Sequence, residues 1–259
     1  MTASLKSHSQ DGTLILTISN PQQHNALGPE IYAAGVEAVT AAESNPEVRS
    51  IILTGEGRVF SAGGNVKRLQ AAREGQMQAQ RQTLESLSSW VDAIRTSAKP
   101  VIAAVEGPAV GAAFALVLAC DFLLAAEDAY FFMAHSKIGL TPDGGGSWQL
   151  ARALPRPLAT DALMRGSRLS AALLHQYGLV NQICSPGQAL TSALALAADL
   201  NQRPSNVLGG IKELINDAEQ QPLSAHLVQE GQAFLRHLGH ENAGEGIAAF
   251  LEKRPPHFR

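Results

Sequence analysis

Short apolar runs with the composition of buried β-strands alternate with helix-like segments along most of the chain. Ser50 to Leu53 and Val101 to Val105 are rich in β-branched residues, and each run borders a turn signal. Pro29 to Glu43 and Lys67 to Ile94 have the composition of helices, with a break predicted at Gly75 in the second. Strands that alternate with helices in this way predict an α/β fold with mainly parallel strand pairing.

Three further segments complete the predicted core. Thr13 to Ile18 and Phe122 to Ala125 are predicted strands, and Gly107 to Ala119 is a predicted helix. The helical segment belongs to an uncharged run that extends to Cys120. Its roughly 14 residues would span about 21 Å as a helix, which is short of the ~30 Å hydrocarbon core of a bilayer. We therefore predict a buried core helix and not a membrane span.

Strand signals stop after about Ser185, and the rest of the chain is predicted to be helical. The pairs Arg203-Pro204 and Gln221-Pro222 separate the helical segments. We predict two regions: a core at residues 1–199, and a helical C-terminal region at residues 200–259 that ends in an irregular tail. The predicted helices are Gln188 to Leu200, Val207 to Ala218 and Leu223 to Leu238.

The composition fits a folded protein of the reducing cytoplasm. With 45% hydrophobic and 17% charged residues among 259, the chain can bury a large core. A formal net charge of −3 gives no general attraction to nucleic acid or to an anionic membrane. Cys120 and Cys184 are too few for a disulfide framework, and Met1 to Gln10 lacks the apolar stretch of a signal peptide. We therefore predict a cytoplasmic protein with neither membrane nor nucleic-acid partners.

Three glycine-containing turns carry the candidate chemistry. Val59 to Asn65 follows a strand, and its paired glycines would let backbone N–H groups approach a ligand. Glu106 to Ala113 lies between a strand and a helix, where free N–H groups and the helix dipole favour a developing oxyanion. Thr141 to Gly146 is a flexible turn with one carboxylate, Asp143. Glycine-rich turns also serve as plain connections, and these fit neither a dinucleotide fingerprint nor a P-loop. The sequence contains no metal-ligand cluster or redox-cofactor motif.

The order and spacing of the turns resemble the enoyl-CoA hydratase/isomerase family, also called the crotonase superfamily, from about Leu14 to Ser185. The stretch Ala134 to Trp148 is similar to isomerase-like members that act in phenylacetate and ring catabolism. The resemblance implies a ββα spiral core with a C-terminal helical region, and an acyl-CoA substrate with no separate cofactor. The matching segments are Asn20-Pro21, Asn25-Ala26-Leu27, Phe60 to Asn65, Gly107 to Gly111 and Cys120-Asp121.

The resemblance also implies roles for single residues. The family's two oxyanion donors correspond to the backbone N–H groups of Gly64 and Ala112, and losing one such donor typically costs about 3–4 kcal/mol of barrier. Lys67 fits a contact with the phosphates of coenzyme A and a solvated surface lysine equally well. We expect Asn65 to hydrogen-bond its own loop. The residues expected to contact coenzyme A are Lys67, His24, Ala26 and Ala62.

The sequence departs from the family's hydratases at both of their catalytic glutamates. The two positions correspond here to Ala115 and His135, so the usual two-glutamate addition of water is not expected. Asp143 lies where some family isomerases carry their acidic base, and we expect Trp148 and apolar neighbours to desolvate it. The structural alternative for Asp143 is a cap on the following helix. His135 is either a proton carrier or a packed core side chain.

We therefore predict an enzyme that isomerises the double bond of an acyl-CoA thioester through an enolate, with Asp143 as acid and base. One alternative is an enoyl-CoA hydratase or ring-opening hydrolase that uses Asp143 with His135. The other is a catalytically silent acyl-CoA-binding protein. The family implies a homotrimer or a dimer of trimers, and the apolar spacing in Leu223 to Leu238 fits such an interface as well as packing within one chain.

Overall fold

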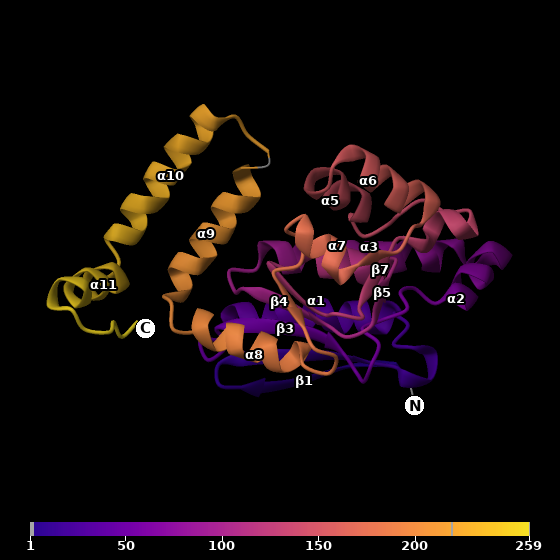
Figure 1. Ribbon diagram of the computed structural model, residues 1–259, viewed down its shortest axis with the longest axis horizontal. Helices are drawn as coiled ribbons and strands as arrows, with labels where there is room; N and C mark the ends of the chain where they lie inside the picture. The colour runs from indigo at the N-terminus through magenta and orange to yellow at the C-terminus, as the bar shows by residue number, and fades with distance from the viewer. Residues whose placement is uncertain (1–2, 219, 259) are drawn as a thin grey trace.

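Six strands form one sheet in the lower half of the computed structural model (Figure 1). The structure describes residues 3–218 and 220–258. Neighbouring strands pair in parallel except for the first two, which form an antiparallel hairpin, and this confirms the predicted fold class and pairing. In spatial order the strands are β1 (Ser4–Gln10), β2 (Thr13–Ser19), β3 (Ser50–Gly55), β4 (Val101–Val105), β6 (Phe122–Ala126) and β9 (Gln182–Cys184).

Helices cover both faces of this sheet, so its central strands are apolar on both sides. Because successive side chains of a strand point in opposite directions, Ile15 and Ile52 face α8 (Ala189–Leu200), whereas Leu16 and Leu53 face the other helical layer. The small buried side chains of α8 let this helix lie close to the strands. They are Ala189, Ala193 and Ala197. The other layer contains α1 (Pro29–Ser44), α3 (Met77–Thr96) and α4 (Ala112–Ala119).

A second, three-stranded sheet takes up part of a segment predicted to be helical. Residues 107–119 are not helical throughout, because β5 (Pro108–Val110) precedes α4. Gly107 and Gly111 have φ angles of 58° and 55°, which interrupt a helix at both positions. A Cβ at Gly107 would stand 2.2 Å from the carbonyl oxygen of Arg58, so the two loops can touch only because this residue is glycine. The strands are β5, β7 (Tyr130–Phe132) and β8 (Leu169–Ser170).

The long predicted helix is interrupted where the sequence indicated. Its parts are α2 (Val66–Ala71), a π-helical turn at Ala72–Gln76, and α3, and Gly75 at the junction has a φ of 123°. Further along, α3 crosses α1 at Gly35, where a Cβ would stand 2.1 Å from the indole ring of Trp90. The remaining helices of the core are η1 (Pro21–Gln23), η3 (Ala134–Ile138), α5 (Gly146–Ala153), α6 (Arg156–Thr160), η4 (Asp161–Arg165) and α7 (Ala171–Gln176).

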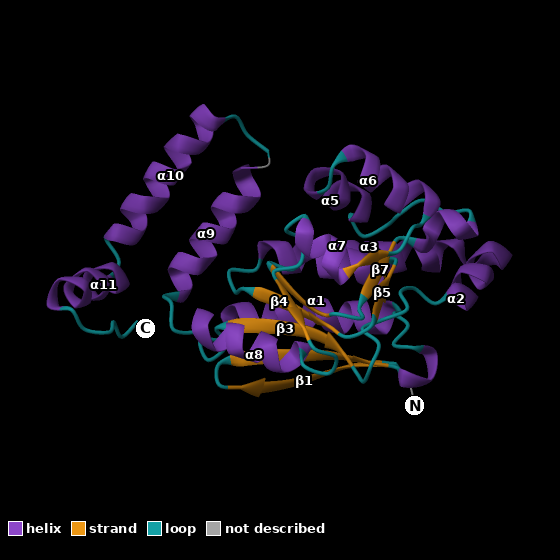
Figure 2. Ribbon diagram, viewed as in Figure 1, coloured by secondary structure: helices purple, strands orange, loops and turns teal. Residues whose placement is uncertain are grey.

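The C-terminal helices project from the core, and no strand accompanies them in the described residues (Figure 2). The helices α9 (Ser205–Ala218), α10 (Leu223–Leu238) and α11 (Glu241–Glu252) confirm the predicted helical region, although the bounds of α11 were not predicted. The division between residues 1–199 and 200–259 stays a prediction. Within residues 3–218 and 220–258, no helix combines the length and the apolar character needed to cross a bilayer. The cytoplasmic location also stays a prediction.

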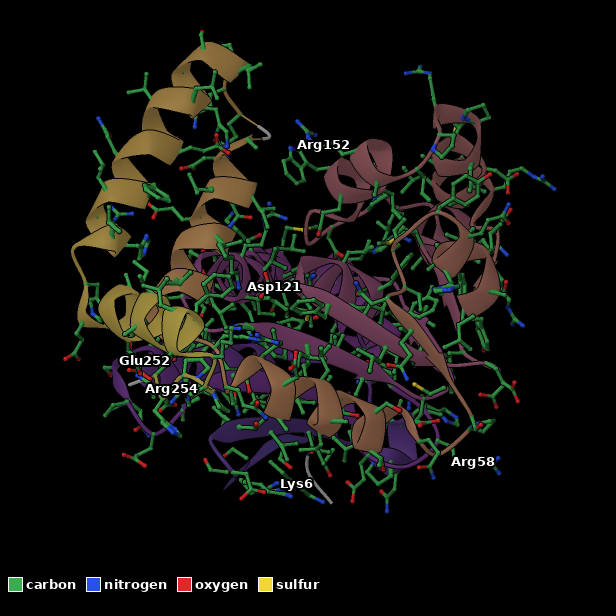
Figure 3. The ribbon with its side chains drawn as sticks, turned by 60° about the vertical axis from the view of Figure 1, so that its left-hand side comes forward. Lys6, Arg58, Asp121, Arg152, Glu252 and Arg254 are labelled. Atoms are coloured by element: carbon green, nitrogen blue, oxygen red, sulfur yellow. The ribbon has the colours of Figure 1, made fainter. Side chains whose placement is uncertain are left out.

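A half-buried ion pair attaches α9 to the core. The ammonium of Lys212 donates to the carboxylate of Asp121 at 2.7 Å and to the carbonyls of Ile94 and Lys99 at 2.7 and 3.4 Å. The same carboxylate oxygen accepts the N–H of Val101 at 2.8 Å. Asp121 is labelled in Figure 3. Burial raises the pKa of Asp121, and the Lys212 ammonium acts in the opposite direction. The pair therefore fixes α9 where α3 ends and β4 begins.

Candidate active site

Three loops meet at the carboxyl end of the parallel sheet, the edge at which α/β proteins commonly bind ligands. They follow β2, β3 and β4. Leu27 of the first loop pairs with Gly64 of the second, and Ser61 of the second pairs with Ala109 of the third, each in a single-residue parallel bridge. The loops therefore form one continuous strip of backbone hydrogen bonds.

The direction of the Gly64 N–H is determined by its own peptide unit. The carbonyl oxygen of Gly63 accepts the N–H of Leu27 at 2.8 Å. Because the C=O and N–H of a trans peptide point in opposite directions, the Gly64 N–H points away from Leu27. It donates to no protein acceptor in the described residues, and Gly64 is exposed. This N–H is therefore available to a ligand oxygen.

The N–H of Ala112 is available for a similar reason. Ala112 is the first residue of α4, and the carbonyl of Gly111 accepts the N–H of Ala115 at 3.0 Å in the first bond of that helix. The Gly111 N–H donates to the carbonyl of Phe132 at 2.9 Å. For the Ala112 N–H, the described part of the chain contains no acceptor. It therefore lies unpaired at the positive end of a helix.

The two donors lie close together because Gly63 has no side chain. A Cβ at Gly63 would stand 2.3 Å from the carbonyl oxygen of Val110 and 3.7 Å from the nitrogen of Ala112. The φ of Gly63 is 81°, which also favours glycine. Two unpaired N–H groups on adjacent loops can stabilise negative charge on a carbonyl oxygen placed between them.

Asp143 and His135 face each other beside these loops. Nε2 of His135 lies 3.3 Å from Oδ1 of Asp143, and the two side chains are 11% and 30% exposed. The His135 ring also borders Gly111, where a Cβ would stand 3.4 Å from its Cε1. The contact is not aligned as a hydrogen bond, and neither Oδ1 of Asp143 nor Nδ1 of His135 has another partner in the described residues, although both atoms are buried. Buried polar atoms without a protein partner are uncommon, and they occur at catalytic sites.

The turn that carries Asp143 packs directly on α4 and η3. A Cβ at Gly144 would stand 2.9 Å from the Cβ of Ala115, and one at Gly146 would stand 2.2 Å from Cε of Met133. The glycine backbone of this turn therefore occupies the space that a longer side chain at position 115 would need. The turn can bring Asp143 to this position because residue 115 is alanine, which carries no carboxylate.

The structure does not support the structural alternative for Asp143, and it does not place Trp148 against this side chain. Its side chain does not cap α5, because the N-cap residue is Gly145 and no side chain caps that helix. The ring centroid of Trp148 lies 5.0 Å from the guanidinium carbon of Arg95 and 3.9 Å from that of Arg152, and the indole lines a separate hollow. These two cation–π contacts hold Trp148 in a hollow whose lining does not include Asp143.

Tyr32 of α1 is a buried residue, not indicated by the sequence, whose ionisation is affected by the charge of Asp143. Tyr32 is 3% exposed, and its ring packs against that of Trp90 at 6.3 Å between centroids. Burial raises the pKa of Tyr32, and the negative charge of Asp143 acts in the same direction. The phenol therefore lies within electrostatic reach of the carboxylate. A tyrosine within a helical apolar pattern carries no sequence signal for this position.

The residues expected to contact coenzyme A lie along the first two loops. The carbonyl of His24 accepts the N–H of Ala62 at 2.9 Å, which brings His24, Ala26 and Ala62 together. Lys67 is exposed in the first turn of α2 and makes no ion pair within the described residues. The side chain of Asn65 accepts the N–H of Lys67 at 3.0 Å and caps α2, which confirms its role in ordering the loop. The contacts with coenzyme A stay predictions.

Comparisons with known proteins identify the family of the chain. The family model described as enoyl-CoA hydratase/isomerase matches residues 8–259. The chain is similar to the crystal structure of an enoyl-CoA hydratase from Polaromonas sp. JS666, with 58% identity, a TM-score of 0.97, and coverage of 99% of this chain and 100% of that one. It is 35% identical to the 1,2-epoxyphenylacetyl-CoA isomerase of Escherichia coli K12 over 97% of both chains. It is 31% identical to the 2,3-dehydroadipyl-CoA hydratase of the same organism over 96% of both.

Proposed function

Because the chain belongs to the enoyl-CoA hydratase/isomerase family, whose members are enzymes acting on acyl-CoA thioesters, we propose that it shifts the double bond of an enoyl-CoA. In this proposal Asp143 is both acid and base. The observation that carries it is the buried oxygen of Asp143, which lacks an aligned protein partner beside the turn of Ala112. The similarity to a 1,2-epoxyphenylacetyl-CoA isomerase favours a ring-derived acyl group.

In the proposed reaction, Asp143 takes a proton from C2 of a 3-enoyl thioester. The electron pair moves onto the thioester oxygen and gives a dienolate, whose negative charge the N–H groups of Gly64 and Ala112 stabilise. The protonated carboxyl group then returns the proton to C4, which leaves the double bond between C2 and C3. One carboxylate suffices because the proton leaves and returns on the same face of the substrate.

We also propose that coenzyme A lies along the first two loops, with contacts at His24, Ala26 and Ala62. The exposed ammonium of Lys67 is suited to a phosphate, since it has no ion-pair partner in the described residues. Lys67→Ala is expected to raise KM for enoyl-CoA thioesters and to leave KM for the shorter pantetheine thioesters unchanged.

The test of Asp143 is NMR-detected deuterium exchange in D₂O. Enoyl-CoA thioesters with straight-chain and ring-derived acyl groups are incubated with wild type, with Asp143→Asn, and with Asp128→Asn as an exposed control outside the site. We expect exchange at C2 and C4 and migration of the double bond in wild type and in the control. Both rates are expected to fall about 10²–10⁴-fold in Asp143→Asn, the usual contribution of a general acid–base group. Exchange that persists in Asp143→Asn would contradict the proposal.

A second candidate function is favoured by the approach of His135 to Asp143 at 3.3 Å. Two groups that exchange protons could together orient a water molecule and deliver a proton, so a hydratase or ring-opening hydrolase with unusual residues fits this contact. If wild type adds water to the substrate and both His135→Gln and Asp143→Asn lose this activity, the hydratase or hydrolase function is favoured. Isomerisation without water addition would exclude it.

We further propose a homotrimer or a dimer of trimers assembled through the C-terminal helices. Eleven of the eighteen large apolar side chains exposed among the described residues lie on α9, α10 and α11. Exposed apolar side chains gathered on a few helices are typical of protein–protein interfaces. These side chains are Ile211, Ile215, Leu223, Leu227, Val228, Phe234, Leu235, Leu238, Ile247, Phe250 and Leu251.

A further inference from the structure

Ser61 lies at the centre of the strip that joins the three loops. It is fully buried, and its hydroxyl donates to the carbonyl of Asn25 at 2.7 Å and accepts the N–H of Gly63 at 3.1 Å. Its backbone N–H donates to the carbonyl of Pro108 at 3.1 Å, and its carbonyl accepts the N–H of Val110 at 3.0 Å. Ser61 therefore contacts the first loop through its side chain and the third loop through its main chain.

The hydroxyl of Ser61 and the N–H of Leu27 hold Gly63 from its two sides. Ser61 holds the peptide unit that precedes Gly63, and Leu27 holds the unit that follows it, which carries the Gly64 N–H. Gly63 has a positive φ and no side chain, so its own torsions resist rotation weakly. The orientation of the Gly64 N–H thus depends on the hydrogen bonds at both ends of Gly63.

Both hydrogen bonds to Gly63 depend on one short segment of the first loop, residues 25–27. Leu27 donates directly, whereas Ser61 is held by the carbonyl of Asn25. Asn25 is itself fixed, because its buried amide donates to the carbonyls of Glu56 and Val59 at 3.0 and 2.7 Å. The segment is therefore a rigid support to which Gly63 is attached twice.

We propose that Ser61 is a positioning residue, whose hydroxyl holds the peptide before Gly63 so that the Gly64 N–H points at the oxygen of the bound thioester. The inference rests on the proposed function only in placing the oxyanion at Gly64, and it does not depend on which residue moves the proton. Without the hydroxyl, Gly63 is held at one end only, by the bond from Leu27, and the Gly64 N–H is oriented less firmly. Because the donor itself remains, thioester binding persists, whereas the angle-dependent stabilisation of the enolate weakens.

The experiment compares full-length wild type, Ser61→Ala and Ser61→Cys. Thr54→Val is the matched control, because the Thr54 hydroxyl is also buried and donates to the carbonyl of Ala104 at 2.9 Å, away from Gly63 and Gly64. The first readout is the infrared carbonyl band of bound cinnamoyl-CoA labelled with carbon-13 at the thioester carbonyl, a probe with no proton at C4 to lose. The second readout is kcat and KM for the enoyl-CoA that wild type converts fastest.

Wild type and Thr54→Val are expected to move the carbonyl band to lower frequency on binding. In Ser61→Ala most of that displacement is lost, kcat falls about tenfold to a hundredfold, and KM stays within about threefold. Ser61→Cys, a weak donor and acceptor, is expected to be intermediate, and it carries the test if thermal unfolding shows that Ser61→Ala is not folded.

Two results would overturn the inference. If Ser61→Ala and Ser61→Cys fold and show the full displacement of the carbonyl band with unchanged kcat, the role of Ser61 is overturned and the proposed function is unaffected. No displacement in wild type would overturn the oxyanion site of the proposed function, and the role of Ser61 with it.

Discussion

At the scale of single residues, Tyr32 is a buried acid that is coupled to the candidate site. Burial raises the pKa of its phenol, the charge of Asp143 acts in the same direction, and the guanidinium of Arg68 opposes both. An unfolded chain ionises tyrosine near pH 10, whereas the folded chain keeps this proton to higher pH. The contribution of Tyr32 to stability is therefore fully present below about pH 10 and is lost as the pH rises above that value.

We predict that the free energy of unfolding falls more steeply above about pH 10 in wild type than in Tyr32→Phe. One such group contributes a slope of at most about 1.4 kcal/mol per pH unit. Urea unfolding at about pH 8.5 and about pH 11 measures the difference, and other alkaline groups cancel because both proteins contain them. Equal slopes would mean that Tyr32 ionises as readily in the folded protein as in the unfolded chain.

Side chains that carry chemistry were easier to predict than residues that hold the backbone. The resemblance pointed to Asp143 and His135, and their side chains do lie in contact. It also indicated Gly64, whose proposed role uses a main-chain N–H and leaves no side-chain signature. Ser61 and Asn25 were not identified as supports, because the carbonyl that Ser61 contacts is 36 positions away and no local pattern encodes such a bond.

At the scale of secondary-structure elements, the attachment of α9 depends on Lys212. We predict that Lys212→Met lowers the free energy of unfolding by about 1–3 kcal/mol, because it leaves the half-buried carboxylate of Asp121 without its counter-ion. Combining it with Asp121→Asn removes both charges and is expected to recover much of the loss. Urea unfolding of the single and double variants measures both effects.

The control for this experiment is the exposed pair of Arg203 and Asp199 at the end of α8, whose side chains are 57% and 59% exposed. Arg203→Met is expected to change stability by less than about 1 kcal/mol, since exposed ion pairs contribute little. A double variant of Lys212 and Asp121 that is no more stable than Lys212→Met would argue against an unpaired charge as the cause.

Elements with a clear apolar period were predicted, and elements stabilised only by their neighbours were not. The strand β1 is an edge strand whose side chains are almost all exposed, so its sequence shows no alternation. The three-residue strand β5 exists through its pairing with β7 and the interruptions at Gly107 and Gly111. The helix α11 lies in the region predicted to be helical, but its bounds were not predicted.

At the scale of the whole molecule, the proposed trimer makes a simple prediction. Light scattering is expected to give three or six times the chain mass of 27.3 kDa. Phe250, which is 83% exposed on α11, is expected to lie in the interface, so Phe250→Glu should reduce the mass. Met164→Glu serves as a control, because Met164 is 75% exposed on the core and lies outside α9 to α11. A monomeric mass for wild type would refute the assembly.

The strip that joins the three loops also determines when activity can arise as the chain folds. Ser61 joins Asn25 to Pro108 and Val110, and no short fragment of the chain contains all of these partners. Closing long loops costs chain entropy, so contacts of this kind form later than the local contacts of helices. On refolding, the helical circular dichroism signal should return before turnover does. The turnover rate recovered during refolding would then measure the fraction of molecules in which the three loops have joined.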